Sequence, residues 1–172
     1  MIIFKDVVTG DEMFSDAYEF SLIDDVVYEV DCKTVTIKKG ADVDIGANAS
    51  AEGGEEELED GSITVNNIVY NFRLNDTQYD EKSYMKDLKP YVKKIKAHLE
   101  STGSTPEEIK KWEANMQKFA KKVLSKAMFP NWEFYIGESM ALGGMVVLLN
   151  YREDGITPYM VFWKHGLKEE KV

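Results

Sequence analysis

The 172-residue sequence predicts an α+β protein with a β-rich, sandwich-like core and one inserted antiparallel helical hairpin. Short runs rich in β-branched and aromatic residues, separated by polar turns, occupy both ends of the chain and are typical of strands. The region between them repeats apolar residues at spacings of three and four, which is typical of amphipathic helices. Since a chain of this length usually forms one domain, residues 1–172 are expected to form a single unit.

The strands of the core are expected in three segments, residues 1–39, 62–80 and 128–172. Alternation of Tyr18, Phe20 and Leu22 with polar residues predicts an early strand with one buried face. A turn is expected at residues 152–155, which read Arg-Glu-Asp-Gly. The expected strands are residues 18–22, 26–30, 34–37, 63–65, 68–72, 132–136, 145–151 and 159–163.

The hairpin is expected over residues 82–127. Thr105 is the expected cap of its second helix, with Pro106 at the first helical position and Glu108 completing a capping box. Pro90 interrupts the first helix and is expected to kink or divide it. The apolar stripes are Tyr84, Leu88, Tyr91, Val92, Ile95 and Leu99 in the first helix, and Ile109, Trp112, Met116, Phe119, Val123 and Ala127 in the second.

Residues 40–61 combine small residues, glycines and a run of acids. Such a segment buries too little apolar surface to offset the entropy of ordering, so a mobile acidic loop is expected. Asp42, Asp44, Gly46 and Asn48 resemble the start of a calcium-binding EF-hand loop. The later positions do not match an EF-hand loop, because Ala47 stands at the position of the invariant glycine and Gly53 at the position of the closing glutamate. Weak calcium binding and a solvated linker remain the two interpretations.

The sequence offers few candidate groups for ordinary covalent catalysis. Cys32 is the single cysteine, which excludes an intramolecular disulfide and a multi-cysteine metal site. It is expected in a polar turn or half-buried. His98 and His165 are far apart in sequence, and no nucleophile, nucleotide-binding or zinc-protease motif is present. We therefore expect a binding protein that is not an enzyme and requires no cofactor.

Charge is unevenly distributed. The net charge is -10, which disfavours direct binding to nucleic acid. Residues 82–126 nevertheless hold twelve lysines and five acids. This basic segment is either a docking surface for an acidic partner or a solvated face that keeps the helices soluble. The candidate docking lysines are Lys93, Lys94, Lys96, Lys110, Lys111, Lys118, Lys121 and Lys122.

The amino-terminal apolar run is interrupted at once by Lys5 and Asp6. No stretch approaches the roughly 20 apolar residues of a membrane span. A cytoplasmic location without a membrane span is therefore expected. Glu12, in the segment Asp11–Asp16, is a surface acid unless another observation assigns it to recognition.

Several motifs supply that observation. Residues 1–3 with Asp11–Asp16, Ile45–Glu52, Phe134–Glu138, and Leu148–Gly155 with Thr157–Met160 resemble the signatures of the translationally controlled tumour protein (TCTP) family. The resemblance continues to Gly166-Leu167 and spans essentially the whole chain.

The resemblance implies a β-rich core similar to that of small Rab-binding, guanine-nucleotide-free chaperones. It also implies a multifunctional hub in growth and survival control, with tubulin or microtubules, a Rheb-like small GTPase and anti-apoptotic Bcl-family proteins as partners. By position, Glu12 is the GTPase contact, and Asn48 and Glu133 are weak calcium ligands. The lysines of the helical region would contact microtubules. Because Val172 stands where some members have a dimerising cysteine, a monomer is expected. Stimulation of guanine-nucleotide exchange and simple calcium buffering are the alternative functions.

Overall fold

The structure, a computed structural model, describes residues 1–38, 43–44 and 62–172. Three antiparallel sheets form the body, in the strand orders β12-β1-β2, β3-β4-β11-β10-β9-β8 and β6-β5-β7. The strands are β1 (Ile2–Asp6), β2 (Glu12–Ser15), β3 (Phe20–Ile23), β4 (Val27–Asp31), β5 (Thr34–Lys38), β6 (Val43–Asp44), β7 (Ser62–Asn66), β8 (Asn75–Thr77), β9 (Glu133–Ile136), β10 (Val147–Tyr151), β11 (Pro158–Trp163) and β12 (Leu167–Lys171). The helices are α1 (Asn67–Phe72), α2 (Glu81–Ser101) and α3 (Pro106–Val123), with 3-10 turns η1 (Phe129–Asn131) and η2 (Lys164–Gly166).

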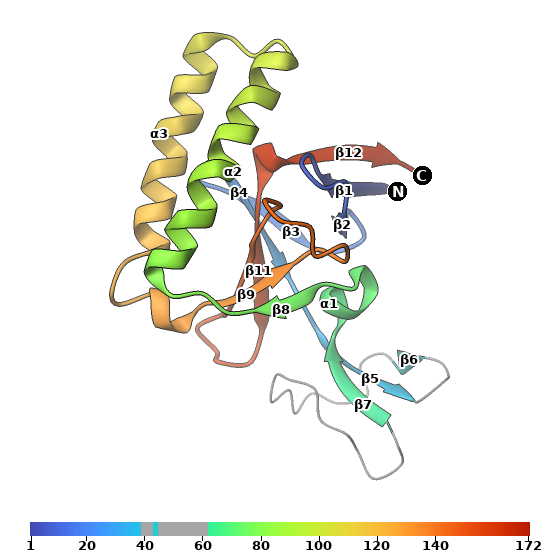
Figure 1. Ribbon diagram of the computed structural model, residues 1–172. Coiled ribbons are helices and arrows are strands. Elements are labelled where there is room, and N and C mark those ends of the chain that lie inside the picture. Colours follow the sequence, from blue (N-terminus) through green and yellow to red (C-terminus); the bar gives the residue numbers. More distant parts are fainter. Residues whose placement is uncertain (39–42, 45–61) are drawn as a thin grey trace.

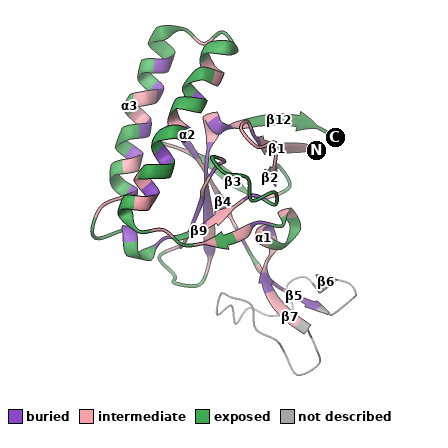
Figure 2. Cartoon of the chain, viewed as in Figure 1, coloured by how far each residue is buried: buried purple, intermediate pink, exposed green. Residues whose placement is uncertain are grey.

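The two long helices lie side by side and form the connection between β8 and β9, which are neighbours in the six-stranded sheet (Figure 1). The predicted α+β architecture with an inserted hairpin is therefore confirmed. The hairpin packs on the sheet through aromatic contacts, including Tyr84 with Phe134 and Phe119 with Trp163. Buried residues recur along both helices and along β11 (Figure 2).

The predicted caps and stripe of α3 are confirmed, with one exception at its end. Thr105 and Glu108 form the reciprocal capping box, and Pro106 opens the helix. The buried residues of α3 are Ile109, Trp112, Met116, Phe119 and Val123. Ala127, expected to continue this stripe, is exposed because the helix ends at Val123.

Pro90 does not divide α2, which runs unbroken from Glu81 to Ser101. The proline is exposed, so the carbonyl that lacks its helical partner lies on the solvent side of the helix. Leu88, Tyr91 and Ile95 are buried on the opposite side. Packing of this face keeps the helix continuous through Pro90, which overrides the local preference of proline to end a helix.

The expected strand at residues 68–72 is wrong, because this segment is helix α1. The Asn66 side chain accepts hydrogen bonds from the backbone N–H groups of Ile68 and Val69, which caps the helix. Arg73 ends it in the left-handed conformation, with φ of 54°. Ile68 is fully buried against the core. A good cap and one buried anchor therefore outweigh the β preference of the apolar residues.

The small sheet of β1, β2 and β12 packs on the large one through aromatic side chains. Phe4 stacks on Phe14 at 4.5 Å between ring centroids, and Phe14 contacts Phe162 of β11 at 4.6 Å. Strand β3 departs from the sequence prediction of one buried face, since both Phe20 and Leu22 are exposed. β3 is the edge strand of its sheet, so its apolar residues are only partly covered.

A buried carboxylate joins the hairpin to β1. Asp6 is 1% exposed and accepts four hydrogen bonds at 2.8–3.1 Å. The donors are the backbone N–H groups of Val8 and Met145, the Thr9 hydroxyl and the Tyr91 hydroxyl. This arrangement, here called the Asp6 node, fixes α2 and the loop before β10 to the first strand.

Strands β5, β6 and β7 form an arm that projects from the body (Figure 1). The pairing of β5 with β7 aligns Val35 with Val65. These two side chains and Ile37 form a small apolar cluster of their own. Most of the expected acidic loop, with Asn48 and the EF-hand-like run, lies outside the described residues.

Candidate functional site

A cavity of about 610 Å³ lies where the arm, α1 and the β8 edge of the large sheet meet. Its wall is mixed in character, with aromatic rings, two carboxylates, amides and hydroxyls, and it contains no lysine, arginine or histidine among the described residues. The lining residues are Thr34, Asn66, Val69, Leu74, Asp76, Thr77, Gln78, Tyr79, Trp132, Glu133, Phe134, Tyr135, Leu149, Tyr151 and Pro158. The volume is in the range of pockets that bind small molecules or side chains.

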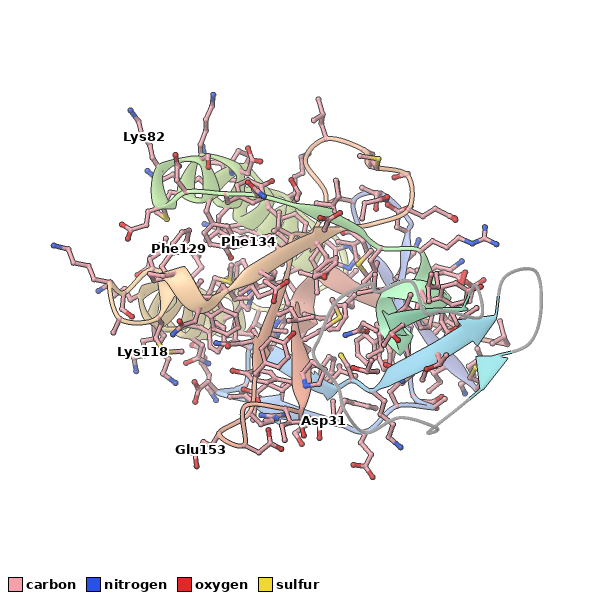
Figure 3. All side chains as sticks on the ribbon, turned by 90° about the horizontal axis from the view of Figure 1, so that it is seen from below. Asp31, Lys82, Lys118, Phe129, Phe134 and Glu153 are labelled. Carbon is pink, nitrogen blue, oxygen red and sulfur yellow. The ribbon has the colours of Figure 1, made fainter. Side chains whose placement is uncertain are left out.

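Strand pairing brings the two carboxylates of this cavity together. In the register of β8 and β9, Asp76 is opposite Tyr135, and Glu133 lies two residues before Tyr135 on the same strand. Because side chains alternate along a strand, all three share one face of the sheet. Phe134 has the opposite orientation, and its ring contacts Tyr84 of α2 and Phe129. Figure 3 shows Phe129 and Phe134 close together.

The negative charge of the cavity affects its titratable groups. Partial burial, and secondarily repulsion from Asp76, raise the pKa of Glu133 above its ordinary value. Burial and the Glu133 charge likewise raise the pKa values of Tyr135 and Tyr151. Within the part of the chain that the structure describes, no hydrogen bond or ion pair reaches either carboxylate. Both acids are therefore available to a cationic ligand.

Trp132 closes one side of the cavity and is 8% exposed. Its indole Nε1–H is buried, and within residues 1–38 and 62–172 it has no hydrogen-bond partner. Its ring makes an edge contact with Tyr159. The indole therefore lies on the Tyr159 side of β9, opposite the face that carries Glu133 and Tyr135, and its N–H is not exposed to the cavity.

Glu12, the predicted GTPase contact, lies elsewhere, at the start of β2. It is exposed and faces Lys5 in the register of β1 and β2. Lys5 contacts Glu170 of β12, and this partner together with Glu12 raises the pKa of Lys5. Glu12 is thus one of two acids beside a single lysine. It shares neither a strand nor the cavity with Glu133.

The lysines of the hairpin form a third candidate surface. Lys82 and Lys118 point outwards from the helices in Figure 3. Among the described residues, two hairpin lysines form ion pairs, Lys122 with Asp24 at 3.0 Å and Lys96 with Glu113 at 3.3 Å. The seven principal docking candidates, Lys93, Lys94, Lys110, Lys111, Lys118, Lys121 and Lys122, are all exposed. Each of these side chains is therefore accessible to solvent.

The structure corrects the position of Cys32, which was expected in a polar turn or half-buried. It is 2% exposed, and burial raises the pKa of its thiol to about 12. The thiolate is therefore scarce at neutral pH, which argues against a nucleophilic role. His98 lies in the last turn of α2.

Within residues 1–38, 43–44 and 62–172, no three acidic, histidine or cysteine side chains come together in a way that could hold a metal ion. Glu133 has Asp76 as its acidic neighbour, while Asn48 lies outside the described residues. In the same ranges, no helix has both the length and the apolar character needed to cross a membrane.

Sequence reasoning singled out Glu133 and missed Asp76 and the aromatic wall. The run Asn75-Asp76-Thr77 is polar and carries no strand signal. Only its pairing with β9 places it beside Glu133. The double asparagine Asn66-Asn67 before an apolar run was an available cap signal, and it would have indicated α1.

The fold defines a β-core protein whose helical hairpin is inserted between two neighbouring strands of one antiparallel sheet. The family model described as "Translationally controlled tumour protein" matches residues 1–168. The chain belongs to the TCTP family. It is 57% identical over 172 residues to the translationally-controlled tumor protein homolog of Debaryomyces hansenii, with full coverage of both chains. The homolog of Schizosaccharomyces pombe is 57% identical over 171 residues, covering 99% of each chain.

Solved structures of the family have the same fold. The translationally controlled tumor-associated protein of Schizosaccharomyces pombe gives a TM-score of 0.81 at 55% identity, with both chains fully covered. The TCTP of Caenorhabditis elegans gives 0.75 at 31% identity, covering 100% of this chain and 99% of that one. The expected likeness to Rab-binding chaperones stays a prediction.

Proposed function

We propose that this chain is a non-enzymatic, cytoplasmic binding and regulatory protein of TCTP type that associates with tubulin or microtubules through its helical hairpin. The exposed lysines of α2 and α3 carry the proposal. Of the seven principal candidates, Lys122 is the one with an ion pair among the described residues. The other six candidates form no ion pair among the described residues.

Electrostatics support an acidic partner on this surface. Residues 82–126 carry a charge of +7 within a chain of net charge -10, so the cations are concentrated on one projecting element. A patch of one sign raises the rate of encounter with a surface of the opposite sign. Because exposed charges are screened over about 8 Å at physiological salt, such binding weakens as salt rises.

Co-sedimentation with microtubules over a salt series tests this function. We expect binding to fall steeply with salt, and to be weaker for the double variant Lys110→Gln/Lys111→Gln. The matched control is Lys33→Gln/Lys168→Gln, which removes the same charge from exposed positions outside the hairpin. Binding that is insensitive to salt, or equal in the two variants, would contradict hairpin docking.

A second candidate function is contact with a Rheb-like small GTPase at Glu12, including stimulation of nucleotide exchange. Its support is the exposed position of Glu12 on β2 and the matching amino-terminal signature of the family. Acidic side chains can compete for the Mg²⁺ and phosphate-binding groups of a GTPase. Glu12→Ala should reduce binding to purified nucleotide-free Rheb and slow nucleotide release, whereas Glu19→Ala, another exposed acid, should not. Equal behaviour of both variants would remove Glu12 from this role.

Weak calcium binding at Asn48 and Glu133, up to a simple buffering function, is a further proposal. The raised pKa of Glu133 supports it, because a divalent cation would relieve the repulsion from Asp76. Amide-resolved NMR at millimolar Ca²⁺ should shift signals of β9, and Glu133→Gln should abolish these shifts. If no amide signal shifted during the titration, calcium binding would be excluded. Binding to anti-apoptotic Bcl-family proteins rests on family membership and stays a prediction.

A further inference from the structure

The cavity beside β8 has the composition of a site for an organic cation. Asp76 and Glu133, which have no hydrogen-bond or ion-pair partner among the described residues, share a face of the sheet with the rings of Tyr135 and Tyr151. An ammonium or guanidinium group is attracted both by carboxylates and by the faces of aromatic rings. The apolar stem of such a ligand would pack on the same rings, as the stems of lysine and arginine commonly do.

The molecule already contains an occupied site of this kind. Arg152 lies 4.1 Å above the ring of Tyr159 and donates hydrogen bonds to Glu29 at 2.6 Å and to Asp31 at 2.7 Å. The Arg152 site therefore combines two carboxylates with a tyrosine face around one basic side chain. The cavity repeats this combination with Asp76, Glu133 and its tyrosines, but among the described residues no basic side chain enters it.

The strand next to the cavity has a free edge. β8 pairs with β9 on one side and is the last strand of the six-stranded sheet. On its other side, no partner for the backbone groups of Asn75–Thr77 occurs among the described residues. An edge of this kind can bind an extended peptide as an added strand. Because Asp76 belongs to both the edge and the cavity wall, a strand bound there passes directly beside the carboxylates.

We propose that this cavity binds a lysine or arginine side chain presented by an extended segment of a partner protein, which pairs with the outer edge of β8. The backbone of the segment supplies the pairing, and the cavity supplies selectivity for a basic residue. This surface is separate from the hairpin lysines and from Glu12, so the proposal does not depend on either of the docking functions above.

Amide-resolved NMR titration of the full chain tests the proposal with three probes. The first is the acetylated and amidated peptide Thr-Val-Lys-Val-Thr, the second replaces its lysine with norleucine, and the third is n-butylammonium. We expect the lysine peptide to shift the amide signals of β8, β9 and Tyr151. We also expect it to bind at least tenfold more tightly than either of the other two probes. Equal binding of the norleucine peptide overturns the cation site. Equal binding of n-butylammonium overturns the pairing with β8, and absence of binding overturns both.

Variants assign the binding to the two acids. The double variant Asp76→Asn/Glu133→Gln should lower the affinity for the lysine peptide at least tenfold, because both side chains lose their charge with little change in shape. Glu153→Gln/Glu169→Gln removes the same charge from exposed positions outside the cavity and should leave the affinity within twofold. Equal loss in both variants means that net charge alone attracts the peptide, and this overturns the site. The spectrum of each variant without peptide verifies its fold.

Discussion

Asp6 is 1% exposed between the hairpin and β1, whereas Asp76 and Glu133 stand in the open wall of the cavity beside β8. Four protein donors surround the Asp6 carboxylate. Among the described residues, none reaches the two carboxylates of the cavity. A buried acid must find its partners within the fold, since an unpaired one would be very costly. An acid at a cavity can leave its partner to be supplied by a ligand. The contrast separates a carboxylate that serves folding from a pair that is available for binding.

Replacing Asp6 with alanine tests the folding side of this comparison and should have the largest effect. The substitution leaves the buried Met145 N–H without an acceptor, and it leaves the Tyr91 hydroxyl only the longer contact of 3.5 Å with the Gly166 carbonyl. We expect this to cost about 3–4 kcal/mol in the free energy of unfolding. Urea unfolding measures this loss. Glu153→Ala, at an exposed turn position, should stay within about 0.5 kcal/mol of the parent chain. A loss below about 1 kcal/mol for Asp6→Ala would contradict the role of the node.

The Asp6 node can also be disturbed from its far side, at Gly166. A Cβ at this position would collide with the Tyr91 hydroxyl, which donates to Asp6. Gly166→Ala should therefore cost about 1–3 kcal/mol by overpacking. In a Tyr91→Phe background the obstructing oxygen is absent, so the additional cost of Gly166→Ala should shrink. Thermal or urea unfolding of the four chains measures this coupling, and strictly additive effects would show that the collision does not matter.

Alkaline pH provides a third comparison. Burial, and secondarily the charge of Asp6, raise the pKa of Tyr91 well above its usual value. The folded chain thus keeps a proton that the unfolded chain loses above a pH of about 10. Stability from this group is intact below that pH and falls above it, by about 1.4 kcal/mol per pH unit. Between pH 9.5 and 11, the free energy of unfolding should decline less steeply with pH for Tyr91→Phe than for the parent chain. Equal slopes would contradict this assignment.

Glu133→Gln should have the smallest effect on stability. Partial burial and Asp76 raise the pKa of Glu133, so its charged form is disfavoured in the folded state. The penalty is absent below the unfolded pKa and appears as the pH rises through the folded one. At pH 7 the variant should therefore be as stable as the parent chain or slightly more stable, within about 0.5 kcal/mol. A clear loss in urea unfolding would show that Glu133 has a structural partner, which would remove the contrast with Asp6.

Much of the hairpin could be predicted because its signals are local. Thr105, Pro106 and Glu108 lie within one turn, and their hydrogen bonds involve neighbouring residues. The apolar stripe from Ile109 to Val123 follows from helical geometry alone. Pro90 shows the limit of such signals, because α2 continues through it where the opposite face is buried.

The sites were less accessible to prediction. Glu133 was identified by its position in the family motif, with Asn48 as its expected partner. In the structure its acidic neighbour is Asp76, which β8 brings beside β9. β12 was also missed, because the charged run Leu167–Lys171 has no strand pattern of its own and pairs with β1 through the backbone. Helix α1 was predicted as a strand from its β-branched and aromatic residues, and the asparagine cap before it was not considered.

The sequence by itself determined the family, the α+β class, the helical hairpin and the concentration of lysines on it. These follow from motifs, periodicity and composition, which need only neighbouring residues. The tertiary structure decided the Asp6 node and the cavity of Asp76 and Glu133. The physical reason is that buried carboxylates and sheet edges find their partners far along the chain. The insertion of the hairpin between β8 and β9 separates Asp76 from Glu133 in sequence, and only backbone pairing of the two strands brings their charges together.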